Sequence, residues 1–299
     1  MRDLIGAHRR AVGLCVLLLL GLALWLRLVT FVERVNGQAD YGSLIRSSLD
    51  SLLSTIAVSA AIGTFFWWVR ASDRARFGEL FPDRIASQLE RAAQEADEWD
   101  YVGHTARYVR ARILPILGAR TSRVGKRIAL NLVIIDPTNP KACQEYAAYR
   151  NTSRSASIVP DPWTAKRVQT ELLATMICLI RAKARFPDLG ITLGFAPSFG
   201  LWRFDRSNRM VMMTQEDPQQ PAYYYEEGTR FFAYHSRECA LALQFARTVS
   251  ITKPPKETLS RQDVDGILKT LLGEASWNHL APLRTDAHRM AENPVSPYA

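Results

Sequence analysis

The chain has 299 residues, of which 47% are hydrophobic and 22% charged, and 38 Lys and Arg against 29 Asp and Glu give a formal net charge of +9. This length and apolar content suffice for one large domain or two ordinary ones, and they exclude a disordered or collagen-like chain. The four cysteines are too few for a protein held together by disulfides.

Two runs before residue 70 have the length and apolar character of membrane-spanning helices. Residues 11–32 carry a single charge, Arg27, and residues 51–69 carry none. A helix that crosses a bilayer needs about 20 such residues. The second run ends in aromatic residues followed by Arg70, a pattern typical of a membrane interface. The sequence therefore predicts a two-span membrane anchor over residues 1–70.

Basic residues gather at the outer ends of both runs, whereas the connecting segment 33–50 is poorer in them. The positive-inside rule then predicts an inner (cytoplasmic) membrane location of bacterial type, with both termini in the cytoplasm. Cleavage of the first run as a signal peptide stays open as an alternative, because its basic start and the small residues Gly37 and Ala39 fit a signal sequence.

Small residues recur at i, i+4 and i+8 in the second run, as Thr55, Ser59 and Gly63. Such a stripe lets membrane helices approach closely, so it indicates a homodimer contact, with packing against the first run as the alternative. The cysteines and histidines have no metal-ligand spacing, so neither a metal nor a cofactor is expected.

After the predicted anchor, a connecting amphipathic helix is expected over residues 71–98. Residues 101–135 then contain seven Lys and Arg and no acidic residue. A helix is predicted over about 105–117, and a strand is predicted over 128–135. This strand is apolar except at Asn131, as is typical of sheets covered on both faces.

Further along, the pattern predicts helices over 140–150 and 161–185 and a strand over 191–195. This β-α-α-β order is typical of an α/β domain with a mixed, mainly parallel sheet. Short strands are expected over 202–205 and 210–214, and a helix over 236–249. We expect the α/β domain to cover residues 99–252, and a C-terminal helix and tail to cover 253–299.

Two places in this domain favour an anion site. Gly103, His104 and Thr105 open a predicted helix that then carries Arg107 and Arg110, so backbone amides, a hydroxyl and guanidinium groups converge as they do around a phosphate. The alternative is a capped helix with a solvated basic face. Asp136 follows a buried strand, and α/β domains bind ligands at this end of their strands, so it is a candidate ligand-binding residue. The alternative is that Asp136 only forms an Asp-Pro turn before the next helix.

The segment from Ser198 to Asp205, together with residues 210–214, resembles the terminal hairpin of a phospholipase D-like module. With Trp99, Tyr101 and Gly103 before it, the resemblance extends over about residues 99–249. It implies an α/β fold that holds a phosphate-bearing ligand, with Ser198, Arg203 and Asp205 joining the residues around His104. An Arg-Asp pair inside the sheet is the alternative reading of Arg203 and Asp205.

The resemblance departs from the family at its catalytic motif. Phospholipase D enzymes use His-x-Lys-x4-Asp, whereas this chain has Arg203-Phe204-Asp205 and reaches Met210. Without that histidine there is no covalent phosphohistidine route. The catalytic residues are therefore not identified, and His104 and His235 are the candidates for a base supplied from elsewhere, with structural hydrogen bonding as the alternative.

Three functions follow as hypotheses. The first is a membrane-tethered sensor or effector that binds a phosphate-bearing ligand through a degenerate phospholipase D-like domain. The second is a phosphodiesterase or nuclease with a rearranged site. The third is a two-span dimeric scaffold without a ligand. The basic block favours an anionic lipid surface as a partner, and nucleic acid is the alternative for the same charges.

Overall fold

The computed structural model describes residues 50–65 apart from 52, 53 and 56, and then residues 77–153, 162–254 and 256–296. The chain divides into two compact units, Met1–Arg74 and Ala75–Ala299. The described residues of the first unit are helical. The second unit contains every strand described below and the candidate site.

The predicted two-span anchor is not supported. Among the residues that the structure describes, no helix combines the length and the apolar character that a bilayer crossing requires. The predicted inner-membrane location, with both termini in the cytoplasm, depended on those spans, so it is not supported either.

Residues 11–32, the first predicted span, lie outside the described residues, as do 66–69 at the end of the second. Thr55, Ser59 and Gly63 are exposed helical residues, and nothing lies within 4 Å of the place where a Cβ on Gly63 would be. The homodimer contact expected at these three positions stays untested.

An eight-stranded sheet forms the centre of the second unit, in the order β1-β7-β6-β5-β2-β3-β4-β8. Its strands are β1 (Phe77–Leu80), β2 (Glu98–Val102), β3 (Ile128–Ile135), β4 (Leu189–Ala196), β5 (Arg203–Ser207), β6 (Met210–Thr214), β7 (Ala222–Glu226) and β8 (Arg247–Ile251). Only β2–β3 and β3–β4 pair in parallel, and the other pairs of this sheet are antiparallel.

The expected fold class is therefore corrected a second time: the domain is α/β with a mixed sheet, but the sheet is mainly antiparallel. The physical reason lies in the connections. Short turns join β5 to β6, and such a turn can only reverse the strand direction, whereas a parallel pair needs a long crossover. The helices between β2, β3 and β4 provide such crossovers, and there the strands are parallel.

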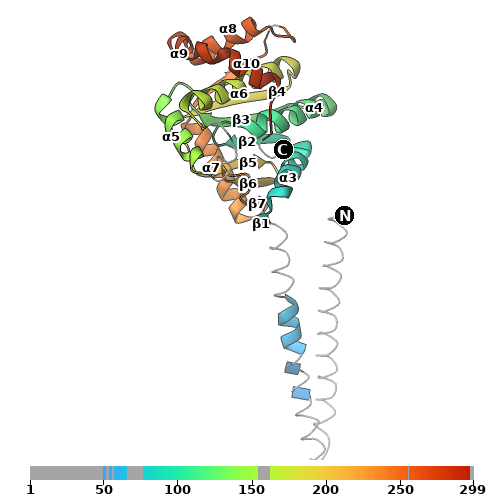
Figure 1. The fold of residues 1–299 in the computed structure, drawn as a ribbon. Helices are drawn as coiled ribbons and strands as arrows, with labels where there is room; N and C mark the ends of the chain where they lie inside the picture. Colours follow the sequence, from blue (N-terminus) through green and yellow to red (C-terminus); the bar gives the residue numbers. More distant parts are fainter. Residues whose placement is uncertain are drawn as a thin grey trace, which may run out of the picture. The chain divides into compact units, whose positions relative to one another are not determined.

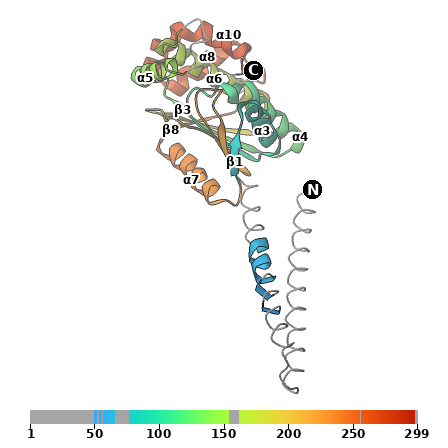
Figure 2. The same ribbon diagram turned by 60° about the horizontal axis from the view of Figure 1, so that its bottom comes forward.

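Most helices of this unit lie on one side of the sheet, and α7 (Arg230–Phe245) covers the other face (Figure 1 and Figure 2). The first group is α3 (Pro82–Glu95), the π-helix η1 (Val109–Ile113), α4 (Leu114–Val124), α5 (Pro140–Asn151), α6 (Ala165–Arg185), α8 (Arg261–Leu272), α9 (Glu274–Leu280), the 3-10 turn η3 (Ala281–Leu283) and α10 (Arg284–Glu292). We call the first face the helical face and the second the α7 face.

Local sequence explains where several helices begin. Thr164 caps α6 by accepting a hydrogen bond from Arg167 N, and Thr229 caps α7 in the same way. Ser260 and Asp263 form a capping box at α8. The largest core lies on the helical face, where fully buried residues such as Trp99, Leu130 and Leu172 exclude water between the sheet and the helices.

Candidate functional site

The site begins where β2 lies antiparallel to β5. Tyr101 is directly opposite Asp205, and Val102 is opposite Phe204. Because side chains alternate along a strand, Arg203 and Asp205 share the helical face with Tyr101, whereas Phe204 points to the α7 face. A cavity of about 20 Å³ is lined on the helical face by Tyr101, His104, Thr105, Ala106, Arg107, Tyr108, Arg203, Asp205, Thr214 and Glu216. This volume holds about one water molecule.

A tight turn after β2 brings His104 and Thr105 to this cavity. A Cβ on Gly103 would lie 2.5 Å from Tyr101 Oη and 3.0 Å from Arg203 Cγ, so only glycine lets these side chains approach. Ala106 has φ = 53°, a left-handed conformation that residues other than glycine adopt at an energetic cost. The neighbouring strand secures the turn, because Ile135 N donates to His104 O at 3.2 Å.

His104 is buried with both ring nitrogens facing oxygen acceptors. Nδ1 lies 2.8 Å from Glu216 Oε2, and Nε2 lies 2.7 Å from the carbonyl oxygen of Gly200. A carbonyl oxygen only accepts hydrogen bonds, and so does an ionised carboxylate. Both contacts are hydrogen bonds at the same time only when each ring nitrogen carries a proton, and the ring then has no free lone pair.

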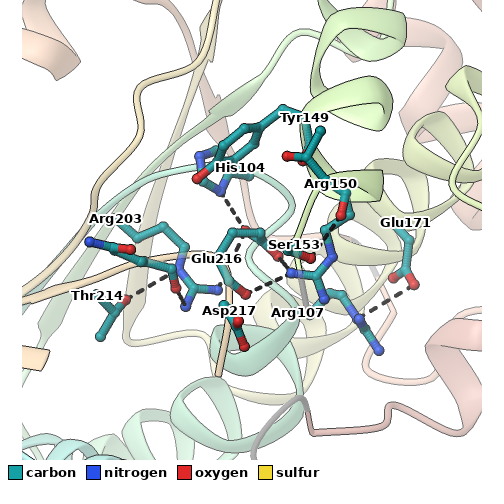
Figure 3. Close-up of polar contacts among 12 residues, drawn as sticks. His104, Arg107, Tyr149, Arg150, Ser153, Glu171, Arg203, Thr214, Glu216 and Asp217 are labelled. Atoms are coloured by element: carbon teal, nitrogen blue, oxygen red, sulfur yellow. Dashed lines mark hydrogen bonds and ion pairs between the residues drawn. The ribbon is translucent and has the colours of Figure 1, made fainter. Parts of the chain in front are cut away.

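Glu216 is the central acceptor of the site, as the close-up shows (Figure 3). Its carboxylate pairs with Arg150 and lies 3.7 Å from Arg203 Nη1, and its backbone carbonyl accepts from Arg150 Nη1 at 2.7 Å. Burial by itself would raise the pKa of Glu216, but Arg203, His104 and Arg150 outweigh it and hold this pKa well below its usual range. Glu216 is therefore ionised.

Arg203 reaches past Glu216 to the end of β6. Its Nε donates to Thr214 Oγ1 at 3.2 Å, and its Nη2 donates to the carbonyl oxygen of Gln215. Arg203 also acts on Asp205, whose pKa it lowers, so these contacts stand beside the Arg203–Asp205 pair that the sequence allowed as an alternative. The guanidinium is fixed by strand β6 and by Glu216, so its position is set by the sheet.

A second carboxylate, Glu171 on α6, holds two more arginines. Arg110 pairs with Glu171 and donates to the Glu171 carbonyl oxygen at 2.8 Å, and Arg107 Nε lies 3.5 Å from Glu171 Oε1. Arg110 belongs to the π-helix η1, a widened turn that is frequent at functional sites. Only Arg107 of this pair is partly exposed, at 21% of its side chain.

The Trp163 ring lies against three arginines. The guanidinium carbons of Arg167, Arg150 and Arg107 are 4.5, 5.2 and 5.7 Å from the centre of the ring. An indole face attracts cations within about 6 Å. Trp163 thus helps to gather positive charge beside the cavity, and it is itself buried.

Asp205 lines the cavity together with Glu216, but its carboxyl group differs from that of Glu216 in its protonation. Its carboxyl is buried, and its Oδ1 has no hydrogen-bond partner in the described part of the chain. Burial raises the pKa of Asp205 to about 7, although Arg203 opposes this change. Asp205 therefore keeps its proton in acid and up to near-neutral pH.

The cluster carries more positive than negative charge. Arg107, Arg110, Arg150 and Arg203 bring four positive charges, whereas Glu171 and Glu216 bring two negative charges. With Asp205 neutral, the described Arg, Glu and Asp side chains of this cluster hold an excess of two positive charges. Buried charges are stable only when they are paired, so the site favours an additional anion.

The structure brings together five of the residues that the sequence singled out, namely Gly103, His104, Thr105, Arg203 and Asp205. Three others lie elsewhere. Asp136 accepts from Thr138 N at 2.8 Å and pairs with Arg247 at 3.1 Å. Ser198 is exposed in the loop after β4, outside the lining of the cavity. His235 lies on the α7 face, where its Nδ1 is 3.0 Å from Glu238 and its ring contacts Phe204 and Tyr225.

Sequence reasoning missed Glu216, Arg150, Glu171 and Trp163. Glu216 lies in a segment rich in Gln, Pro and Tyr that reads as a loop, and Arg150 ends a short helix. The signal available was the burial of acidic residues, which only the tertiary structure reveals. Within the described ranges, no group of three His, Cys, Asp or Glu residues is arranged to hold a metal ion.

No protein-family model and no curated protein matches the chain. Among solved structures, it is similar to TrmBL2, described as an archaeal chromatin protein with a novel mode of DNA binding, with 8% identity over 70% of this chain and 69% of that chain and a TM-score of 0.35. It is also similar to phosphatidylserine synthase from Haemophilus influenzae Rd KW20, with 12% identity over 69% of this chain and a TM-score of 0.36. The match spans 46% of the length of that synthase. At these TM-scores, neither likeness carries an argument about function.

Proposed function

We propose that the α/β domain is a binding module for a small phosphate-bearing molecule, which it holds at the cavity between Arg203, Arg107 and His104 without hydrolysing it. In this role the protein is a sensor or effector, because the ligand is bound and released unchanged. The excess of two positive charges around a buried cavity is the observation that carries this proposal. A phosphoryl group supplies both the negative charge and the several acceptor oxygens that guanidinium groups bind in pairs.

Access to the site depends on Arg107. The free volume of about 20 Å³ holds one water, and a phosphoryl group needs more room. Arg107 has the most exposed of the four guanidinium side chains, and burial lowers its pKa against the opposing effect of Glu171. We expect Arg107 to turn outward and to contact the ligand at the mouth, while Arg203 stays fixed by Thr214 and Gln215.

The hydrogen bonds of His104 support binding rather than catalysis. A nucleophile or general base needs a free lone pair, and the ring of His104 offers none while both of its nitrogens donate to Glu216 and Gly200. The resemblance of the β5–β6 hairpin to phospholipase D-like modules fits this interpretation as a degenerate member, since Arg203 stands where those enzymes have the histidine. His235 is on the α7 face and takes no part.

The test uses the full chain and inorganic phosphate. Titration calorimetry at constant ionic strength, with chloride as the reference anion, measures binding, and adenosine monophosphate is the second probe. Thermal unfolding gives an independent readout, since a ligand at 100 times its Kd stabilises the native state by about 2.7 kcal/mol. We expect both measurements to detect phosphate.

Variants locate the binding. Arg203→Gln is expected to weaken phosphate binding at least tenfold, because a charge-assisted bidentate contact is lost. Arg123→Gln, an exposed arginine at the end of α4, is the matched control and leaves binding unchanged. Equal affinity in both variants would refute the proposed site. Steady hydrolysis of a generic phosphodiester that is lost in His104→Ala would instead favour the phosphodiesterase alternative.

A further inference from the structure

The α7 helix presents large apolar side chains away from the sheet. Phe231, Tyr234, Leu241 and Phe245 are 56, 66, 42 and 80% exposed. The opposite side of the helix is anchored, since Cys239 packs with Phe204 and Val211 in a small core of its own. The exposed residues therefore belong to a well-fixed helix of 16 residues, and the views of the fold place α7 alone on its face of the sheet (Figure 2).

These residues follow the spacing of a coiled-coil seam. Together with Glu238 they occupy positions 231, 234, 238, 241 and 245, which are separated alternately by three and four residues. Apolar residues at this spacing form the contact stripe of paired helices. A solvated helix face has no reason to keep four large apolar residues in this arrangement.

We infer that α7 is the interface of a homodimer, in which it packs antiparallel against the α7 helix of a second copy. The sequence of the stripe is self-complementary about Glu238. With a twofold axis at that residue, Phe231 faces the second copy's Phe245, and Tyr234 lies within one residue of the level of the second copy's Leu241. A contact that meets itself in this way is what a closed twofold dimer requires.

Charges near the axis fit the same arrangement. Glu238 and Arg237 are adjacent and exposed at the middle of the helix. Across a twofold axis, Glu238 of one copy approaches Arg237 of the other, so each acidic group at the centre meets a basic one. The stripe also continues over an aromatic patch at the sheet edge, where Tyr225 contacts Phe231 at 5.3 Å and Phe77 at 6.5 Å between ring centres.

The area is sufficient for a specific contact. Large apolar and aromatic side chains cover about 200 Å² each, so the exposed fractions of the four residues amount to about 500 Å² per copy. Two copies then bury about 1,000 Å² in total, which is the lower limit for a specific protein interface. Phe77 and Tyr225 are not included in this sum and would add to it.

Sedimentation equilibrium of the full chain at micromolar concentrations tests the inference. The wild-type chain is expected to sediment as a dimer, and Leu241→Glu is expected to weaken the dimer at least tenfold. Phe81→Glu replaces an apolar residue that is 67% exposed ahead of α3, and it serves as the matched control that keeps the dimer. A monomeric wild type, or a dimer that survives Leu241→Glu unchanged, would overturn the inference.

Disulfide trapping tests the antiparallel geometry. Glu238→Cys lies on the axis and is expected to cross-link two copies under mild oxidation. Phe245→Cys lies about 10 Å from the axis, so two such cysteines are about 21 Å apart in an antiparallel pair and do not cross-link. Cross-linking by Phe245→Cys and not by Glu238→Cys would overturn the antiparallel arrangement. Glu238→Arg alone is expected to weaken the dimer. The double variant that exchanges the two residues, Arg237→Glu with Glu238→Arg in both copies, is expected to keep it.

Discussion

Replacing Asp205 with asparagine is expected to change how the stability of the protein depends on pH. Burial raises the pKa of Asp205 from 3.8 to about 7 in the folded protein. Between these values the native state holds a proton that the unfolded chain has lost, so the free energy of unfolding falls as pH rises through this range. Below about pH 4 both states are protonated, and above about pH 7 the full cost is present.

The size of the effect follows from the same two values. A difference of about three pH units at about 1.36 kcal/mol each corresponds to about 4 kcal/mol at most. Asparagine does not ionise, so the variant lacks this decline. The stability of Asp205→Asn relative to the wild type is therefore expected to rise by up to about 4 kcal/mol between pH 4 and pH 8.

Urea unfolding at several pH values measures this relative stability. A constant offset between the two proteins, caused for example by the buried amide, cancels when only the change with pH is considered. A relative stability that stays flat from pH 4 to pH 8 would refute the assignment of a neutral Asp205. Arg203→Gln provides a further check, because loss of the opposing cation is expected to move the decline to higher pH.

Three further predictions concern the site and the core. Glu216→Gln leaves Arg150 and Arg203 without their carboxylate, so we expect it to lower the free energy of unfolding by about 3–5 kcal/mol in urea. The exposed Glu145→Gln on α5 is the control and is expected to change this free energy by no more than about 0.5 kcal/mol. Equal effects of the two variants would contradict the role of Glu216. Gly118→Ala places a Cβ 2.3 Å from the Phe186 ring, so we expect it to destabilise the folded protein by about 1–3 kcal/mol. On α8, the Cβ of Gly266→Ala meets nothing within 4 Å, so this variant is expected to stabilise the folded protein by about 0.5–1 kcal/mol. Thermal unfolding measures both changes. Sulfate is a suitable anion for a pH series because it does not titrate near neutrality. We expect its affinity to fall as pH rises through about 7, because Asp205 then becomes negatively charged. Calorimetry should detect this loss of affinity in the wild type but not in Asp205→Asn.

Several elements of the fold follow from sequence patterns that act locally. The run 128–135, which is apolar except at Asn131, is strand β3, and the capping residues Ser260 and Asp263 begin α8 as expected. The turn at Gly103 and the arginines after it also follow from the sequence, because glycine, His104 and Arg107 are neighbours in the chain. Patterns of this kind succeed where a residue's environment is set within one or two turns of itself.

Other elements depended on contacts that a local pattern does not report. The helix predicted over 236–249 ends at Phe245, because residues 247–249 belong to strand β8, which pairs with the edge of β4 and places Leu193 opposite Val249. The loop of residues 215–228 contains strand β7, which pairs with both β1 and β6. Hydrogen bonds to neighbouring strands outweigh local preference at such positions.

By itself, the sequence determined the α/β class, the mixed sheet and the concentration of arginine in one block. Only the tertiary structure decided that the sheet is mainly antiparallel and that Glu216, 112 residues from His104, pairs with it. The physical reason is that charge and hydrophobicity along the chain fix what a segment can bury, whereas the pairing of β2 with β5 fixes which buried charges meet. The excess of positive charge at the cavity belongs to that second kind of information.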